Sequence, residues 1–214
     1  MFGVRTAAQG QSTLVGQVFG LLGFSFVFTA VGAVLAPRFG PAAGTVGGIG
    51  GLIVLLILIL ARGIPPILRL GLFYLFSVLQ GLVLGVVIGG YVARGQGDIV
   101  ILAAGVTAGT LGVLGAWGWT TKRDLSGWGS VLFIGLIGVL LAAIVGIFVD
   151  APLFHVFVAA ATAIVFSGYT AVHFQQLRRG RGDPIGLAIA IYIDILNLFW
   201  AILRLLNYFI SQRR

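Results

Sequence analysis

The chain has 214 residues, of which 59% are hydrophobic and only 8% are charged, and its mean hydropathy is +1.14. A soluble globular domain needs more polar surface than this composition supplies, so the composition predicts an integral membrane protein. The absence of cysteine excludes disulfides, thiol catalysis and thiolate metal sites. Two histidines are too few for a zinc site built from protein ligands alone.

The net charge of +8 would suggest a nucleic-acid partner in a soluble protein. Here the basic residues are spread over short loops, which is typical of charges that orient membrane helices. The sequence therefore predicts a lipid bilayer as the surroundings and no nucleic-acid partner.

Seven apolar stretches are long enough to cross a bilayer, which takes about 20 residues for roughly 30 Å of hydrocarbon. The first is too long for the apolar part of a cleaved signal peptide, so it is expected to be a transmembrane helix. Short linkers with Pro, Gly or charged residues separate the stretches, so neighbouring helices should be antiparallel. The sequence predicts an all-α membrane protein with a single seven-helix domain over residues 1–214. The expected spans are 13–35, 43–61, 67–93, 99–119, 128–149, 153–176 and 184–209.

The positive-inside rule assigns the cytoplasm to the side that is richer in Lys and Arg. A cytoplasmic N-terminus places eight basic residues inside and four outside, which predicts this orientation in the cell (inner) membrane. Six spans with a re-entrant last segment would put both chain ends inside and stays the alternative. The inside set is Arg5, Arg62, Arg69, Lys122, Arg123, Arg178, Arg179 and Arg181, and the outside set is Arg38, Arg94, Arg213 and Arg214.

Glycine is abundant, with 34 residues, and several glycines recur four residues apart. That spacing puts small residues on one helix face and allows close helix packing, which is preferred here to a ligand-binding role. The glycines concerned are Gly16 and Gly20, Gly47 and Gly51, Gly81, Gly85 and Gly89, and Gly105 and Gly109.

Asp194 is the acidic residue of the last apolar stretch. A carboxylate near the bilayer centre costs about 2.5–3.5 kcal/mol on insertion scales, so it is usually retained for ions, protons or a partner charge. At about 100° per residue, Asp194, Asn197 and Arg204 share one small and polar helix face, which is expected to point into the bundle. Asp194 then lies about 15 Å along the helix from Pro184. The alternative to ion or proton handling is a structural hydrogen bond or charge pair.

His173 is expected within about one helical turn of the level of Asp194, counting back along its helix from the turn near 180–183. A contact between them would respond to protons, since imidazole titrates near physiological pH. The alternative is an interfacial histidine whose ring lies among the lipid headgroups. Arg204 lies about 15 Å beyond Asp194 along the same helix, too far to pair with it, and can extend to the outer surface.

Three segments near the C-terminus resemble the signature of the Bax inhibitor-1 family, also called the transmembrane Bax-inhibitor-motif family. They are residues 166–169 (FSGY), 191–199 (IYIDILNLF) and 203–206 (LRLL). The first five helices are similar to the family mainly in number and length. The resemblance implies a seven-helix fold with the last helix central in the bundle. It also implies a pH-sensitive calcium leak and a cytoprotective or proteostatic role.

In this family, two Asp residues on the last two helices are thought to form a proton-sensing gate. Asp194 matches the second, whereas His173 stands in the place of the first. Two Asp residues repel and share a proton, but Asp and His attract when both are charged, so a shifted, reversed or absent pH response is expected. Arg204 matches a basic position that pairs with a Glu of the second helix in some relatives. This chain has no Glu, so Arg204 is expected only as a possible gating charge.

Two functions follow as alternatives. The first is a pH-modulated passive cation leak, with Ca²⁺ as the expected ion, whose path contains Asp194, His173 and Asn197. Asp194 would bind the ion weakly and transiently, as conduction requires. The second is a membrane-embedded partner that serves a stress response or regulates a membrane protease without transport. Neither Gly-x-Ser-x-Gly nor His-Glu-x-x-His occurs, so no enzyme activity and no cofactor are expected.

Overall fold

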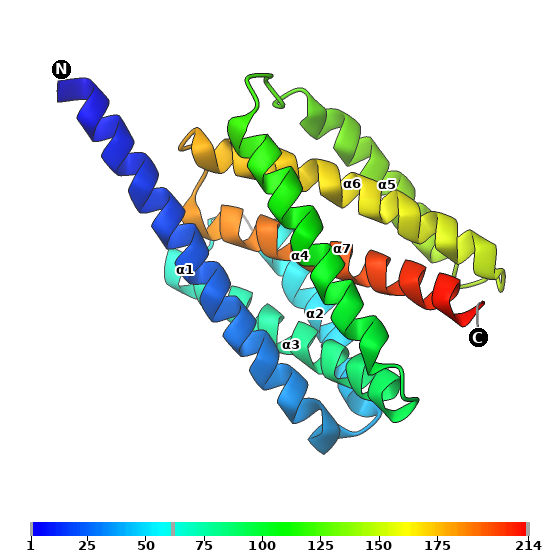
Figure 1. The fold of residues 1–214 in the computed structure, drawn as a ribbon. Helices are drawn as coiled ribbons and strands as arrows, with labels where there is room; N and C mark the ends of the chain where they lie inside the picture. The colour runs from blue at the N-terminus through cyan, green and yellow to red at the C-terminus, as the bar shows by residue number, and fades with distance from the viewer. Residues whose placement is uncertain (1, 61–62, 213–214) are drawn as a thin grey trace. The chain divides into compact units, whose positions relative to one another are not determined.

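The computed structural model is all-helical (Figure 1). It describes residues 2–60 and 63–212, with side chains from Gln11 onward. Within these residues there are seven helices, each long and apolar enough to cross a membrane, which confirms the predicted fold class. The helices are α1 (Phe2–Phe39), α2 (Ala42–Leu60), α3 (Pro66–Ala93), α4 (Gly97–Thr120), α5 (Trp128–Val145), α6 (Pro152–Arg178) and α7 (Pro184–Ser211).

The ends of α1 differ most from the expected boundaries. This helix begins at Phe2 instead of residue 13, because apolarity marks where a membrane span starts and not where helical backbone starts. It also continues beyond the expected boundary at 35 and through Pro37. Pro37 lies in the last turn, where it removes a single backbone hydrogen bond and only two helical residues follow it. The chain turns at Gly40, whose φ of 57° is in the left-handed region that favours glycine.

The fifth helix is shorter than the apolar stretch that predicted it. It ends at Val145, four residues before the expected boundary at 149. Tight turns follow, in which the amides of Ile147 and Phe148 donate to the carbonyls three residues earlier, at 3.1 and 3.0 Å. Hydropathy did not distinguish these apolar turn residues from helix.

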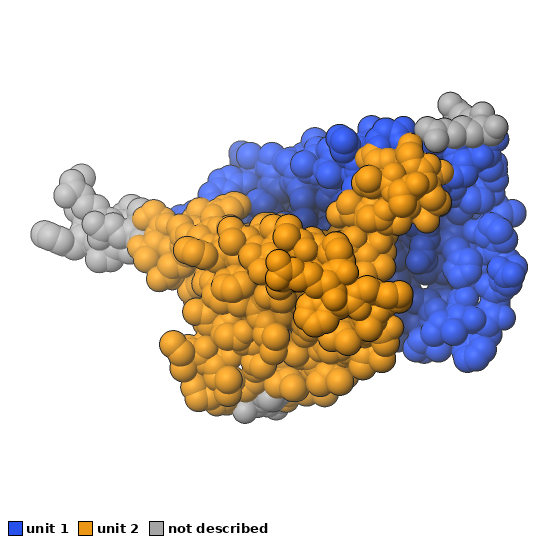
Figure 2. Space-filling view, turned by 90° about the horizontal axis from the view of Figure 1, so that it is seen from below, with its two compact units in different colours: residues 1–11, 98–182, 190–214 blue, residues 12–97, 183–189 orange. Residues whose placement is uncertain are grey.

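Two compact units divide the chain, and Figure 2 colours them separately. One contains residues 1–11, 98–182 and 190–214, and the other contains residues 12–97 and 183–189. The prediction of a single domain stays a prediction.

Glycine brings helices of the second unit close together. A methyl group added at Gly81 of α3 would collide with the carbonyl oxygen of Thr29 in α1, and one at Gly47 of α2 with that of Leu79 in α3. Close packing at Gly47, Gly51, Gly81 and Gly85 is therefore confirmed. The prediction of close packing is wrong for the other five glycines, where an added methyl group would meet no described atom within 4 Å. These are Gly16, Gly20, Gly89, Gly105 and Gly109.

The last helix is the most buried of the seven. In its most apolar window 56% of the residues are buried, compared with at most 33% in any other helix. Side chains that face lipid need not be buried by protein, so this contrast marks α7 as the helix most enclosed by its own chain.

The predicted orientation in the membrane stays a prediction. Some of the basic residues counted for this orientation lie outside the described part of the chain: Arg62, Arg213, Arg214 and the side chain of Arg5.

Candidate functional site: the His173–Asp194 pair

Local sequence signals fix the ends of α6 and α7, the two helices that carry the site. Gly180 has a φ of 61°, and the next amide, of Arg181, donates to the Gln176 carbonyl at 3.0 Å, as in a Schellman motif. At the start of α7 the carboxylate of Asp183 accepts a hydrogen bond from the amide of Gly186 at 2.7 Å and so caps the helix. Arg69 also donates to this carboxylate, at 3.1 Å.

The side chains of His173 and Asp194 are in direct contact. Nδ1 of His173 lies 2.6 Å from Oδ2 of Asp194. The Asp194 side chain is only 2% exposed and that of His173 is 16% exposed. A buried carboxylate is tolerated when it is hydrogen-bonded or paired, so His173 supplies what Asp194 needs. Of the two alternatives for His173, the structure shows the contact with Asp194. Its role in ion or proton handling stays a prediction.

An aromatic ring restrains the histidine. The rings of Tyr169 and His173, one helical turn apart on α6, are stacked with centroids 5.6 Å apart and an interplanar angle of 15°. Stacking limits rotation of the imidazole and leaves Nδ1 directed at the carboxylate. The Phe-Ser-Gly-Tyr segment therefore contributes its tyrosine to the site.

Three protonation states are chemically accessible to this pair. With one proton between a charged imidazole and a carboxylate the pair is neutral. Loss of a proton leaves a neutral imidazole beside a carboxylate, with net charge −1, and gain of one leaves an imidazolium beside a carboxylic acid, with net charge +1. Acidification thus makes the site more positive.

Asn197 and Arg204 are not joined to the pair. The side-chain amide of Asn197 donates to the Ile193 carbonyl of its own helix at 2.9 Å. Arg204 is exposed and lies ten residues beyond Asp194, about 15 Å along α7, as expected. Across the described residues no group of three or more His, Cys, Asp or Glu could hold a metal ion, so the weak ion contact expected at Asp194 would involve one carboxylate.

A second cluster of polar contacts was not anticipated from the sequence. Gln175 is 2% exposed; its amide oxygen accepts the Leu125 amide at 2.9 Å and its amide nitrogen donates to the Arg123 carbonyl at 2.8 Å. Nearby, Arg179, one of the basic residues counted on the cytoplasmic side, donates to Asp124 at 2.7 Å. The partners are 50 or more positions apart in sequence, and no local pattern links them.

The loop carboxylate of this cluster is electrostatically satisfied. Asp124 accepts hydrogen bonds from the hydroxyl and the amide of Ser126, at 2.6 and 3.0 Å. These bonds, together with Arg179, hold the pKa of Asp124 well below its usual value. The loop 121–127 is therefore fastened to the end of α6 by several polar contacts.

Comparison with known proteins shows that the chain is similar to a described family. Residues 11–211 match the family described as inhibitor of apoptosis-promoting Bax1. The chain belongs to this family. The match covers the apolar part of all seven helices, including both members of the His173–Asp194 pair.

Relatives of this chain come from several bacteria. An uncharacterized protein of Helicobacter pylori J99 is 35% identical over 145 residues, covering 67% of this chain and 63% of that protein. The inner membrane protein YbhL of Escherichia coli K12 is 35% identical, covering 63% and 61%. The modulator of FtsH protease YccA from the same strain is 28% identical, covering 63% and 62%. The chain thus spans less than two thirds of the length of these relatives.

These similarities settle the setting of the protein. It is an integral inner-membrane protein of the Bax inhibitor-1 family. None of the three relatives just described carries the name of an enzyme.

Proposed function

We propose that this protein is a pH-modulated passive leak for cations, with Ca²⁺ as the first ion to test. The observation that carries the proposal is the carboxylate of Asp194, buried in a membrane helix and held by a titratable residue instead of a fixed charge. A permanent cation such as Arg would neutralise Asp194 at every pH. Histidine can lose its charge within the physiological range and so leave a negative site.

The charge of the pair gives the direction of the pH response. A passing cation is stabilised by the state with net charge −1 and opposed by the state with net charge +1. The leak should therefore increase with pH and fall on acidification. One carboxylate provides too few oxygens to retain Ca²⁺, and weak binding allows the ion to leave.

Ion flux into liposomes that contain the purified protein tests this proposal. We expect Ca²⁺ entry to rise between pH 5 and pH 8 and to fall about tenfold in Asp194→Asn, the change produced by about 1.4 kcal/mol in the barrier. Asp150→Asn, in the loop between α5 and α6, is the matched control and should conduct as the wild type does. Equal flux at all pH values for wild type, Asp194→Asn and empty liposomes would rule out the leak.

The variant His173→Asp asks whether the histidine sets the response. It replaces the pair by two carboxylates, which share a proton and carry one negative charge over most of the pH range. We expect a larger flux than in the wild type at neutral pH and a decrease only at lower pH. An unchanged pH profile would show that His173 does not control conduction.

A second candidate is a membrane-embedded partner of a protease, favoured by the relative named as a modulator of FtsH protease. This role needs helix surfaces for docking and no ion path. Co-purification with a membrane protease that is equally strong for wild type and Asp194→Asn, without flux in liposomes, would favour it over the leak. Under either proposal the protein has no catalytic activity of its own.

A further inference from the structure

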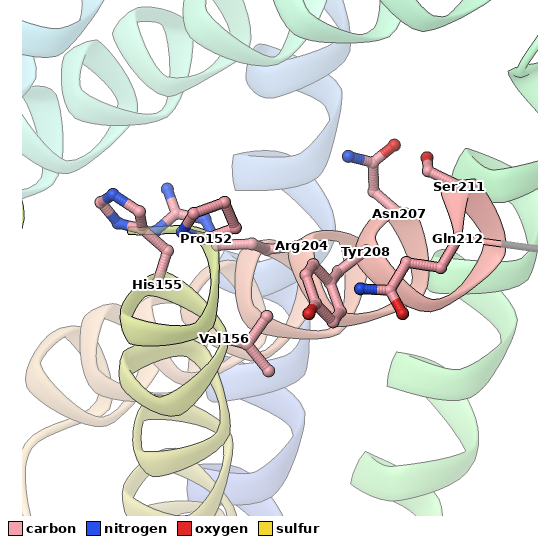
Figure 3. Close-up of a pocket in the computed structure, with 8 residues that line it drawn as sticks. All are labelled: Pro152, His155, Val156, Arg204, Asn207, Tyr208, Ser211 and Gln212. Carbon is pink, nitrogen blue, oxygen red and sulfur yellow. The ribbon is translucent and has the colours of Figure 1, made fainter. Parts of the chain in front are cut away.

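A pocket of about 520 Å³, lined partly by polar side chains, lies where α6 begins and α7 ends (Figure 3). It lies away from the His173–Asp194 pair, and none of its lining residues belongs to that site. Pro152 and His155 line it from the first turn of α6, and Figure 3 shows the Arg204 side chain directed from α7 toward them. Five lining side chains of α7 and its end can donate hydrogen bonds: Arg204, Asn207, Tyr208, Ser211 and Gln212.

Arg204 has no counterion within the described part of the chain. Three carboxylates there pair with other residues: Asp124 with Arg179, Asp183 with Arg69 and Asp194 with His173. Asp150, two residues before the start of α6, makes no ion pair with Arg204 in these described residues. The whole sequence contains five acidic residues, all Asp, against 13 basic ones. Arg204 is therefore available to pair with an anion from another molecule.

The remaining charges at the pocket do not oppose an anion. A helix N-terminus and a helix C-terminus carry about +0.5 and −0.5 of an elementary charge, and this pocket has one of each, so they largely offset. Nε2 of His155 lies 3.1 Å from the Val149 carbonyl and must donate to it. The full positive charge of Arg204 consequently decides the sign of the pocket.

Phosphate is the anion that suits these groups. A guanidinium presents a planar fork that binds two phosphate oxygens at once, and the amide and hydroxyl donors around it can reach the remaining oxygens. Arg204 lies seven residues before Ser211, about 10 Å from the end of α7, from where an arginine side chain reaches the headgroup region. Leu153, Phe157 and Phe209 next to the pocket residues in sequence are exposed and offer apolar surface for acyl chains.

We propose that this pocket binds the phosphate of an anionic phospholipid, with Arg204 as the anchoring charge and Asn207 and Ser211 as neutral donors. The site is independent of the proposed leak, because it needs neither His173 nor Asp194. A phospholipid held here would connect the first turn of α6 to the last turns of α7.

Binding to the purified full chain in detergent tests the site. Phosphatidylglycerol and phosphatidylcholine are titrated and bound lipid is counted by native mass spectrometry for wild type, Arg204→Gln, Arg204→Lys and Arg38→Gln. Arg38 is an exposed arginine near the end of α1 that does not line this pocket, so it is the matched control. We expect wild type and Arg38→Gln to bind phosphatidylglycerol about fivefold more tightly than Arg204→Gln, with Arg204→Lys retaining part of the binding.

A second arm distinguishes a lipid from free phosphate. Inorganic phosphate is added in place of phospholipid, and the melting temperature of the protein is measured for the same variants. Stabilisation by inorganic phosphate that requires Arg204, without preferential binding of phosphatidylglycerol, would keep the anion site but overturn the lipid as its occupant. Equal binding of both lipids and equal melting behaviour in Arg204→Gln, Arg38→Gln and wild type would overturn the site altogether.

Discussion

At the scale of single residues, the protein places a carboxylate where ionisation is expensive and gives it one titratable partner. Asp194 is 2% exposed and its bond to His173 is 2.6 Å long. In apolar surroundings the worth of such a bond depends on the charges present, because an unpaired buried charge costs several kcal/mol whereas a neutral carboxylic acid costs less. The pair should therefore contribute to stability in a pH-dependent way.

Replacement of His173 by Ala measures that contribution. The variant leaves the carboxylate of Asp194 without its partner, and we expect the free energy of unfolding to fall by about 3 kcal/mol at pH 8. At this pH the buried carboxyl group is either charged without a partner or protonated although the solution favours its deprotonation. At pH 5 the carboxyl group keeps its proton more easily, so the loss should be smaller. Thermal unfolding in detergent at both pH values measures this difference. His155→Ala, outside the pair, is the control, and a loss that grows toward low pH would contradict the argument.

The sequence could predict this contact, but it could not show which other polar residues of α7 contact the pair. Asp194, Asn197 and Arg204 share a helix face, and the sequence grouped them on that basis. The structure separates them, because Asn197 bonds to the Ile193 carbonyl and Arg204 lines a different pocket. Helical periodicity gives direction around the axis, whereas hydrogen-bond choice depends on the length of each side chain and on neighbours that periodicity does not specify.

At the scale of helices and loops, Gln175 fastens the loop 121–127 to α6. Gln175→Leu would remove both hydrogen bonds and leave the buried amide of Leu125 without its acceptor, at a cost of about 1–3 kcal/mol. We expect the loop to open locally, so that trypsin cleaves after Lys122 and Arg123 faster than in the wild type. Gln176→Leu changes the neighbouring side chain without touching these bonds and should leave cleavage unchanged. Equal cleavage of both variants would mean that the hydrogen bonds of the Gln175 side chain do not hold the loop.

Close approach of α1 and α3 gives a second prediction at this scale. A methyl group at Gly81 meets the Thr29 carbonyl oxygen, which belongs to helical backbone and cannot move independently. Gly81→Ala is therefore expected to destabilise the protein by about 1–3 kcal/mol, the usual cost of overpacking. Gly89→Ala lies on the same helix, meets nothing within 4 Å, and should be neutral or slightly stabilising because Ala favours helix. Melting temperatures of the two variants in detergent check the contrast, and equal values would contradict it.

The glycines also show where sequence reasoning stops for whole helices. Gly81, Gly85 and Gly89 follow one spacing rule, yet the first two approach α1 closely and the third meets open space. A four-residue spacing of glycines indicates that one face of the helix carries no bulky side chains at these positions. Whether another helix covers that face depends on where the helices cross, and the crossing point is a property of the assembled unit.

At the scale of the whole molecule, composition was a reliable guide because the bilayer imposes a simple rule. Backbone polar groups in hydrocarbon must bond within their own segment, so each long apolar stretch becomes a helix. All seven predicted spans are helices for this reason. The ends were less predictable: α1 extends upstream of its apolar part and α5 stops before its apolar part ends. At the membrane boundary water can hydrogen-bond to backbone groups, so both helix and turn are stable there.

Orientation is the whole-molecule property that sequence predicts most directly and that helix packing does not reveal. The chain has no cysteine, so a single introduced cysteine reports one position without any background mutations. With the N-terminus in the cytoplasm, a membrane-impermeant maleimide should label Arg38→Cys and Gln212→Cys on the outside of spheroplasts. Lys122→Cys should react only after permeabilisation, because the side richer in Lys and Arg is retained in the cytoplasm. Labelling of Lys122→Cys alone in intact spheroplasts would reverse the orientation. Protection of Gln212→Cys together with labelling of Arg38→Cys would instead mean that the last helix does not cross the membrane, and Arg204 would then face the inner leaflet.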